Sequence, residues 1–228
     1  GTTAGLNILD RNTNSFRRVR FTPDTEDMSK RNFIFSLYED RDGDVWIGTL
    51  DGFYLYHNQS ASFEYFGALA GEPLLQTMSF YQDRNNYFWI GTETSIFTFN
   101  KKDGQVKRYT HTNLPISLTG VPSFIEDKNG VLWIGTYNGL LRGEMSTATE
   151  EALPNYQFRA VYPELADFRS NKNMIRCMTT DTKGNIWIGT FDGLLILNPE
   201  EESFLGYQQD ELLPRSLSAN FILSLIHI

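Results

Sequence analysis

The phrase Trp-Ile-Gly-Thr occurs four times in this chain, at residues 46–49, 89–92, 133–136 and 187–190. Its four tryptophans follow one another at intervals of 43, 44 and 54 residues. Similarity at a nearly constant spacing of this length indicates one supersecondary unit that is copied along the chain. The 228 residues are therefore interpreted first as a repeat array.

The same turn signal precedes each copy of the phrase. An aspartate stands six residues before each tryptophan, and in three copies a glycine follows that aspartate by three residues. The second copy has Asn86 at the glycine position, and asparagine is the next-best residue for a left-handed backbone. We expect a tight turn here, in which the aspartate side chain accepts hydrogen bonds from backbone amides.

A second turn signal follows each phrase. Asp51-Gly52, Asn138-Gly139 and Asp192-Gly193 come two residues after the threonine, whereas the second copy has no glycine there. Such pairs predict a β-hairpin in which both central residues have positive φ.

Four short apolar runs make up each unit. In the first repeat they cover residues 33–39, 45–49, 53–57 and 63–66, and turn residues bound each run. Four strands per unit and a period in the forties are typical of β-propeller blades. We therefore predict an all-β fold, a β-propeller of four-stranded antiparallel blades.

Both ends of the chain fit the same repeat. Residues 1–6 resemble the end of a Trp-Ile-Gly-Thr unit, and residues 220–225 resemble residues 32–37. We expect a single domain over residues 1–228, incomplete as a ring, with four whole repeats and a partial blade at each end. The remaining blades of the same propeller are then its first expected partner.

One repeat carries an insertion. Between Gly139 and Phe158 lie eight more residues than between the corresponding Gly52 and Phe63. The extra residues fall in the polar stretch 144–155, which we expect to extend a hairpin on the surface.

Composition and motifs exclude several function classes. A net charge of −8 makes nucleic acid a poor partner. No apolar stretch is long enough to span a membrane, so we expect no membrane contact by this segment. The single cysteine and three histidines, which do not recur in register, indicate neither a metal site, nor a cofactor, nor catalytic residues. The acidic turn 40–44 fails the EF-hand pattern, because Val45 stands where that loop needs glycine.

The residues that recur in every repeat are expected to be structural. Packing between blades must recur, whereas a ligand contact need not. We assign this role to the aspartates, tryptophans and glycines of the repeated pattern: Asp40, Asp83, Asp127, Asp181, Trp46, Trp89, Trp133, Trp187, Gly48, Gly91, Gly135 and Gly189.

Ligand-binding candidates lie where the repeats disagree. The position after the threonine is Leu50, Glu93, Tyr137 or Phe191, and the two aromatic residues offer flat surfaces to a sugar ring. The loops between blades emerge on the same face as the turns between second and third strands. Their basic residues could pair with an acidic sugar. The candidates are Tyr137, Phe191, Glu93, Arg31, Arg169 and Lys172.

The repeat resembles the two-component regulator propeller family. The resemblance rests on Asp-x-x-Gly-x-apolar-Trp-Ile-Gly-Thr-x-Asp/Asn-Gly-Leu and on the segment from Pro214 to Asn220. It implies the periplasmic sensor region of a hybrid two-component histidine kinase of Bacteroidetes type, anchored in the inner membrane and responding to oligosaccharides. It also implies a homodimeric parent protein, whose kinase is absent from these residues.

Two other functions remain open at the level of sequence. Some propellers are lyases or hydrolases, because one fold hosts many functions. A propeller face can also act as a platform for another protein. Binding without chemistry is our leading interpretation, so this segment is not expected to be an enzyme.

Overall fold

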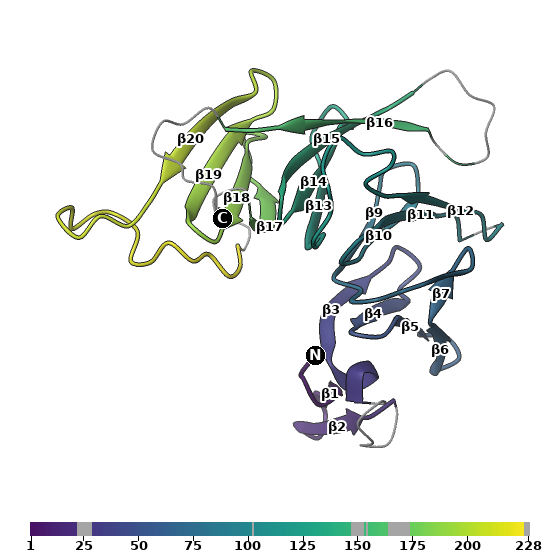
Figure 1. The fold of residues 1–228 in the computed structure, drawn as a ribbon. Coiled ribbons are helices and arrows are strands. Elements are labelled where there is room, and N and C mark those ends of the chain that lie inside the picture. Colours follow the sequence, from purple (N-terminus) through teal and green to yellow (C-terminus); the bar gives the residue numbers. More distant parts are fainter. Residues whose placement is uncertain (22–28, 102, 147–152, 154, 164–173, 226–228) are drawn as a thin grey trace. The chain divides into compact units, whose positions relative to one another are not determined.

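The computed structural model describes residues 1–21, 29–101, 103–146, 153, 155–163 and 174–225. Within them the regular secondary structure consists of β-strands and one short 3-10 turn, η1 (Ser29–Asn32) (Figure 1). It divides into two compact units, one of residues Gly1–Glu93 and Phe97–Lys107, the other of Thr94–Ile96 and Arg108–Ile228.

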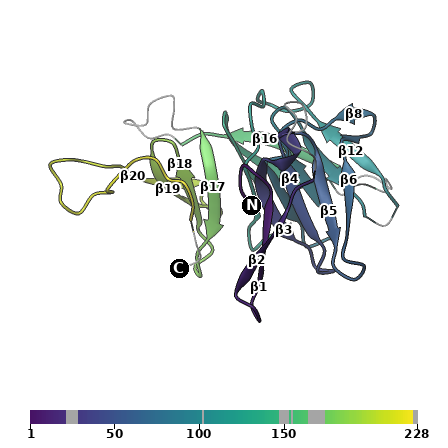
Figure 2. The same ribbon diagram turned by 90° about the horizontal axis from the view of Figure 1, so that it is seen from below.

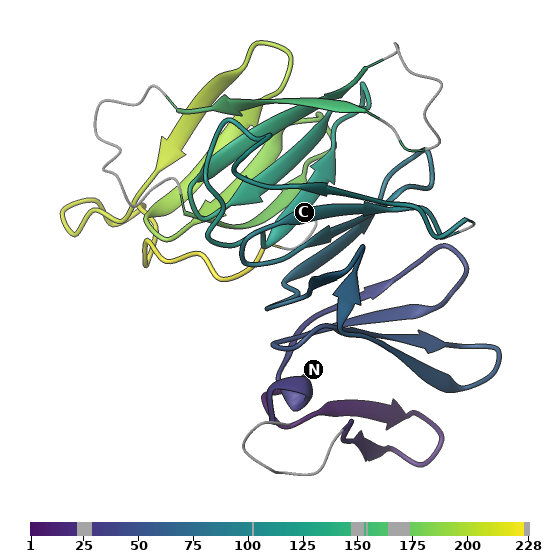
Figure 3. The same cartoon turned by 45° about the vertical axis from the view of Figure 1, so that its right-hand side comes forward.

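The first unit begins with a hairpin and continues into a four-stranded sheet. The hairpin pairs β1 (Leu6–Asp10) with β2 (Ser15–Val19). The sheet has the order β3-β4-β5-β6, and its strands are β3 (Ile34–Glu39), β4 (Val45–Thr49), β5 (Phe53–His57) and β6 (Ser62–Phe66). Figures 2 and 3 show the hairpin, in purple, beside this blue sheet.

A two-stranded ribbon leads from the first sheet to the second. It pairs β7 (Ala68–Leu69) with β8 (Glu72–Pro73). The second sheet has the order β12-β11-β10-β9, with strands β9 (Ser79–Gln82), β10 (Phe88–Gly91), β11 (Ile96–Phe99) and β12 (Val106–Tyr109).

The second unit contains two further four-stranded sheets. The first of them consists of β13 (Ser123–Glu126), β14 (Leu132–Thr136), β15 (Gly139–Met145) and β16 (Tyr156–Val161). The other consists of β17 (Ile175–Thr180), β18 (Ile186–Thr190), β19 (Gly193–Asn198) and β20 (Ser203–Tyr207). In both, consecutive strands are antiparallel neighbours, as in the sheet of β3 to β6.

The predicted fold class is confirmed. In the first repeat the strands differ from the predicted runs by one residue at two boundaries and coincide elsewhere. Each Trp-Ile-Gly-Thr phrase lies on the second strand of a four-stranded sheet, except that Thr92 directly follows β10. The assignment of residues 1–228 to one domain stays a prediction.

The aspartate turn also has the predicted backbone. Gly43, Gly130 and Gly184 have φ values of 82°, 84° and 89°, and Asn86 takes the same left-handed region with φ 68°. In each turn, one aspartate oxygen accepts the amides two and four residues later, as Asp127 does from Asn129 and Val131.

The prediction for the second turn was wrong in one respect. Gly139 and Gly193 have positive φ, but Asn138 and Asp192 do not. The reason is register: Thr136 pairs with Gly139, so the glycine flanks a two-residue turn and is not one of its central residues. The hydroxyl of Thr136 closes this turn, because it accepts the amide of Asn138 at 3.0 Å and donates to the carbonyl of Gly139 at 2.8 Å.

Glycine in the repeated phrase permits close approach of the next strand. A Cβ on Gly135 would lie 2.5 Å from Cγ2 of Ile175, the first residue of β17. A Cβ on Gly189 would lie 2.7 Å from Cγ2 of Ile222, in the segment after β20. A larger side chain at either position would therefore force its neighbours to shift.

A backbone hydrogen bond joins the first repeat, and likewise the fourth, to the segment that follows it. The amide of Thr77 donates to Thr49 at 2.9 Å, and that of Ile222 donates to Thr190 at 3.0 Å. The amide of Ile34 donates to Thr2 in the same way, at 3.0 Å. Thr2 therefore takes the place of the repeat threonine, as the resemblance of residues 1–6 to the end of a unit predicts.

The polar insertion lengthens a hairpin as well as its loop. Glu144 and Met145 belong to β15 and pair with Gln157 and Tyr156. Residues 147–152 and 154 of the predicted insertion 144–155 lie outside the described residues. Among the residues that are described, no helix has the length and apolar character needed to cross a membrane.

Candidate functional site

Three aromatic rings form a row in the second unit. Tyr137 lies in the turn between β14 and β15, and Phe191 lies in the equivalent turn between β18 and β19. Their ring centroids are 5.9 Å apart at 85°, and Phe191 meets Phe221 at 4.6 Å and 66°. The structure thus brings together two sequence-predicted residues, and it adds Phe221, which is 44% exposed. We call these three residues the aromatic row.

Backbone contacts hold Tyr137 in this position. Its amide donates to the carbonyl of Gly120 at 3.0 Å. A Cβ on Gly120 would lie 2.5 Å from Cδ2 of the tyrosine ring, so only glycine leaves room for it. The next residue, Asn138, donates to the carbonyl of Ser117 at 2.8 Å and accepts from the hydroxyl of Thr119. The tyrosine therefore stands on a turn tied to the loop that precedes β13.

Backbone hydrogen bonds to the residue before β17 and within the segment after β20 hold Phe191 and Phe221. The amide of Phe191 donates to the carbonyl of Met174 at 3.2 Å. On either side of Phe221, the carbonyl of Asn220 accepts from Gly193 at 2.7 Å and the amide of Ile222 donates to Thr190. Two backbone hydrogen bonds thus flank the exposed ring and set it against Phe191.

Arg176 adds a cation to the aromatic row. Its Nη1 donates to the hydroxyl of Tyr137 at 3.0 Å. Ile175 pairs with Thr190 and Cys177 pairs with Gly189, so Arg176 is the extra residue of a β-bulge in β17. Bulges redirect a side chain out of the regular alternation of a strand. Sequence reasoning missed Arg176, although a comparison of the repeats at this position distinguishes it.

The other predicted ligand residues are placed differently. Nε of Arg31 donates to Oδ2 of Asp51 at 2.7 Å, and its guanidinium lies 4.1 Å from the ring centroid of Tyr65. Burial of the phenol and the neighbouring Asp51 carboxylate raise the pKa of Tyr65 to about 12, and its hydroxyl donates to Asp51. Arg31 is therefore occupied within its own unit.

Glu93 is half-buried and lies between β10 and β11, in the first unit. Arg169 and Lys172 lie outside the described residues.

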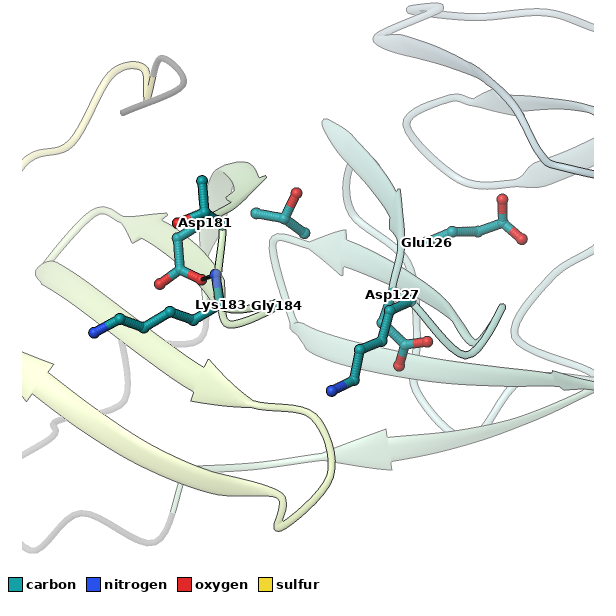
Figure 4. A pocket seen from close by; sticks show the side chains of 8 residues that line it. Glu126, Asp127, Asp181, Lys183 and Gly184 are labelled. Carbon is teal, nitrogen blue, oxygen red and sulfur yellow. Dashed lines mark hydrogen bonds between the residues drawn. The ribbon is translucent and has the colours of Figure 1, made fainter.

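Two clefts of the second unit differ in their relation to the aromatic row. One, of about 530 Å³, lies at the turns between the first and second strands of the two sheets. Figure 4 shows Asp127 and Asp181 on these turns, with Glu126 and Lys183 extending in opposite directions. Because both aspartates are engaged by their tryptophans, at 3.0 Å each, this cleft offers no spare carboxylate from them.

The other cleft, of about 1030 Å³, is lined by the last two residues of β20 and by residues 208–211 and 213–216, which follow it. One of its residues, Gln208, donates through Nε2 to the carbonyl of Asp192 at 3.0 Å, directly after Phe191. A second, Gln209, donates its backbone N–H to Oδ1 of Asn220. These contacts tie the cleft to the residues beside the aromatic row.

The acidic turn of the first unit holds an internal cation. Nζ of Lys101 lies 2.8, 2.9 and 3.1 Å from carboxylate oxygens of Asp40, Asp42 and Asp44. Burial of the ammonium by itself lowers the pKa of Lys101. The hydrogen bonds to the three carboxylates have the larger combined effect and raise that pKa above its ordinary value. The turn that superficially resembles a calcium loop is thus a lysine-binding turn.

The repeated tryptophans are placed for packing. Trp46, Trp89 and Trp133 are fully buried and Trp187 is half-buried. Trp46, for example, stacks on Phe88 with ring centroids 3.9 Å apart, and Phe88 belongs to the next sheet. These tryptophans are separate from the aromatic row, which consists of residues that vary between repeats.

Comparison with known proteins agrees with the fold. The extracellular domains of two putative hybrid two-component systems from B. thetaiotaomicron superpose with a TM-score of 0.73 each, at 22% and 20% identity. The alignments cover 98% of this chain but only 27% and 28% of those domains, so the chain spans about a quarter of their length.

Virginiamycin B lyase from Staphylococcus aureus has a similar fold, with a TM-score of 0.57, 15% identity, and 78% of this chain and 56% of the lyase covered. A search of curated protein sequences finds no match.

The sequence model of the two-component regulator propeller matches four segments, residues 29–51, 72–94, 115–138 and 170–192. Each segment ends in or just after the turn that follows a Trp-Ile-Gly-Thr phrase, and so covers the aspartate turn and the second strand of one sheet. The chain therefore contains four copies of the two-component regulator propeller repeat.

Proposed function

We propose that this chain is a ligand-sensing propeller segment of a membrane-anchored two-component sensor, and that it binds an oligosaccharide at the aromatic row. The observation that carries the proposal is the approach of Tyr137 and Phe191 to 5.9 Å, on equivalent turns of successive sheets. Both residues occupy a position at which the repeats differ in chemistry, as expected for a residue chosen for its ligand.

The chemistry of the row suits a sugar. An aromatic ring offers an apolar face, and the tyrosine also offers a hydroxyl for hydrogen bonding. Sugar rings present C–H groups on one face and hydroxyls at their edges. The side chain of Gln209 in the neighbouring cleft offers both a donor and an acceptor to those hydroxyls, whereas Nε2 of Gln208 is already bonded to Asp192.

The remainder of the proposal rests on the family and on the fold. A sensor of this type would lie in the periplasm, be anchored in the inner membrane by other parts of its polypeptide, and pass its signal to a histidine kinase. Its expected partners are the remaining blades of the propeller and a second copy of the parent protein. Nucleic acid and lipid are not among the partners we propose.

Glycan-array binding followed by titration calorimetry tests the proposed function. We expect the chain to bind a defined set of oligosaccharides, and Tyr137→Ala and Phe191→Ala each to weaken binding by about 30-fold, the effect of removing a central aromatic contact. Phe16→Ala is the matched control, because Phe16 is 69% exposed on β2 in the other unit.

Three outcomes would overturn parts of this proposal. Binding that survives both substitutions would place the ligand elsewhere. Breakdown of a bound glycan into products would replace sensing by a lyase or hydrolase activity. Failure of every glycan to bind, together with a monomer–dimer equilibrium that Tyr137→Ala abolishes in sedimentation experiments, would favour a protein-interaction surface.

A further inference from the structure

Arg176 departs from the chemistry of its equivalents in the other repeats. When the repeats are aligned, Ile34-Phe35-Ser36 corresponds to Ile175-Arg176-Cys177. The middle residue of each triplet is the bulge position. The bulge in β3 contains Phe35 in the same way as the bulge in β17 contains Arg176. The equivalents are apolar in every other copy: Phe35, Met78, Pro122 and Leu223.

Packing therefore does not require a charge at this position. The same backbone accommodates an exposed phenylalanine in β3, where Phe35 is 39% exposed. An arginine at one copy of a repeated apolar position is best explained by a contact that only this copy makes.

No described carboxylate pairs with Arg176. Several other basic residues of the structure have acidic partners, such as Arg31 with Asp51, Arg159 with Glu202, and Lys128 with Glu200. Within the described residues, the hydrogen-bond acceptor of the Arg176 side chain is the neutral hydroxyl of Tyr137. That bond uses one of the five N–H donors of a guanidinium and positions the group beside the aromatic row.

We propose that Arg176 binds an anionic group on the sugar that occupies the aromatic row, a carboxylate or a sulfate ester. This inference rests on the proposed function and narrows it from oligosaccharides in general to acidic ones. The guanidinium fork binds oxyanions through two parallel hydrogen bonds, which ammonium groups do not match. Arg176 thus replaces Arg31 as the basic residue of the site, because Arg31 already binds Asp51.

Matched pairs of glycans test this role. Oligogalacturonates are compared with their methyl esters, and chondroitin sulfate oligosaccharides with their desulfated forms, by titration calorimetry at low and moderate salt. We expect the charged member of one pair to bind at least ten-fold more tightly than its counterpart. We also expect added salt to weaken that binding.

Substitutions at the bulge separate charge from folding. Arg176→Met places there the residue that the second repeat carries, as Met78, and so should keep the fold. We expect it to weaken binding of the charged glycan by about 10- to 100-fold and to leave the neutral counterpart unchanged. Arg176→Lys should recover only part of the loss, and Arg18→Met, on the exposed strand β2, should change nothing.

The outcomes distinguish this inference from the function on which it rests. Neutral glycans that bind with full dependence on Tyr137, and with none on Arg176, would overturn the role of Arg176 and keep the sugar site. Equal binding of the charged and the neutral glycan in both pairs would also overturn the role of Arg176 and keep the sugar site. If neither the pairs nor a general glycan array yields binding, both the site and its charge preference are wrong.

Discussion

Oδ2 of Asp181 accepts a hydrogen bond from Nε1 of Trp187 at 3.0 Å, across the turn that joins the first two strands of its sheet. Its Oδ1 accepts the amides of Lys183 and Asn185. The same arrangement joins Asp40 to Trp46, Asp83 to Trp89 and Asp127 to Trp133. One carboxylate thus closes the turn and orients the tryptophan, which explains why these residues keep a fixed spacing.

The Asp181 carboxylate should make the stability of the chain depend on pH. Burial opposes its ionisation, but hydrogen bonds from Trp187, Asn185 and Lys183 outweigh burial and lower the pKa of Asp181 to about 2. Since the folded pKa is below the unfolded value, the stabilisation is complete above about pH 4 and is lost as the pH falls towards 2.

Urea unfolding of Asp181→Asn at pH 6, 4 and 2.5 measures this effect. We predict a loss of about 1–3 kcal/mol at pH 6, since the amide cannot accept every donor, and a smaller loss at pH 2.5. Glu211→Gln, at an exposed carboxylate, is the control and should cost less than about 0.5 kcal/mol. A loss of the same size at all three values would show that the charge is unimportant.

Lys101 should stabilise the first unit through its three carboxylates. Lys101→Met leaves Asp40, Asp42 and Asp44 facing one another, so we predict a loss of about 1–3 kcal/mol at pH 7. Burial acts against ionisation of Asp40 and Asp44, but hydrogen bonds, including those from Lys101, lower the pKa of both carboxyls. These carboxylates therefore stabilise the fold above their unfolded pKa, and the effect fades as the pH falls through the folded value.

Urea unfolding at pH 7 and pH 3 compares this variant with Lys183→Met, a substitution of an exposed lysine. The difference between the two variants should shrink at pH 3. A constant difference would contradict an ionic origin.

Gly135 and Ile175 should be coupled. Gly135→Ala places a methyl group 2.5 Å from Cγ2 of Ile175, and we predict a destabilisation of about 1–3 kcal/mol. Ile175→Ala removes the conflicting atom but opens a cavity. Chemical unfolding of both single variants and the double variant should show that the double variant is more stable than additivity predicts. Strict additivity would mean that the backbone moves to relieve the contact.

Asn86 should tolerate glycine but not alanine. Its φ of 68° matches the glycine turns of the other three repeats, so Asn86→Gly retains an accessible backbone conformation. Alanine is strained there, and we predict a cost of about 1 kcal/mol relative to glycine. Thermal unfolding of the two variants measures the difference directly. Equal melting temperatures would argue that the turn can change its conformation.

The sequence alone determined the repeat, its strands and the left-handed turn position. These features depend on local rules: alternation along a strand, and the few residues that accept positive φ. It also placed Tyr137 and Phe191 at equivalent positions of successive repeats, as ligand-binding candidates. It misplaced the glycine of the second turn, because a dipeptide such as Asn138-Gly139 does not reveal which residues pair across the hairpin.

Only the tertiary structure decided which variable residues meet. Phe221 is 30 residues from Phe191, and Arg176 is 39 residues from Tyr137, yet each pair is in contact. It also showed that Arg31 is bound to Asp51 and that Lys101 fills an acidic turn 57 residues or more away. Such contacts depend on strand register, a bulge and the packing of successive sheets, which local sequence patterns do not specify.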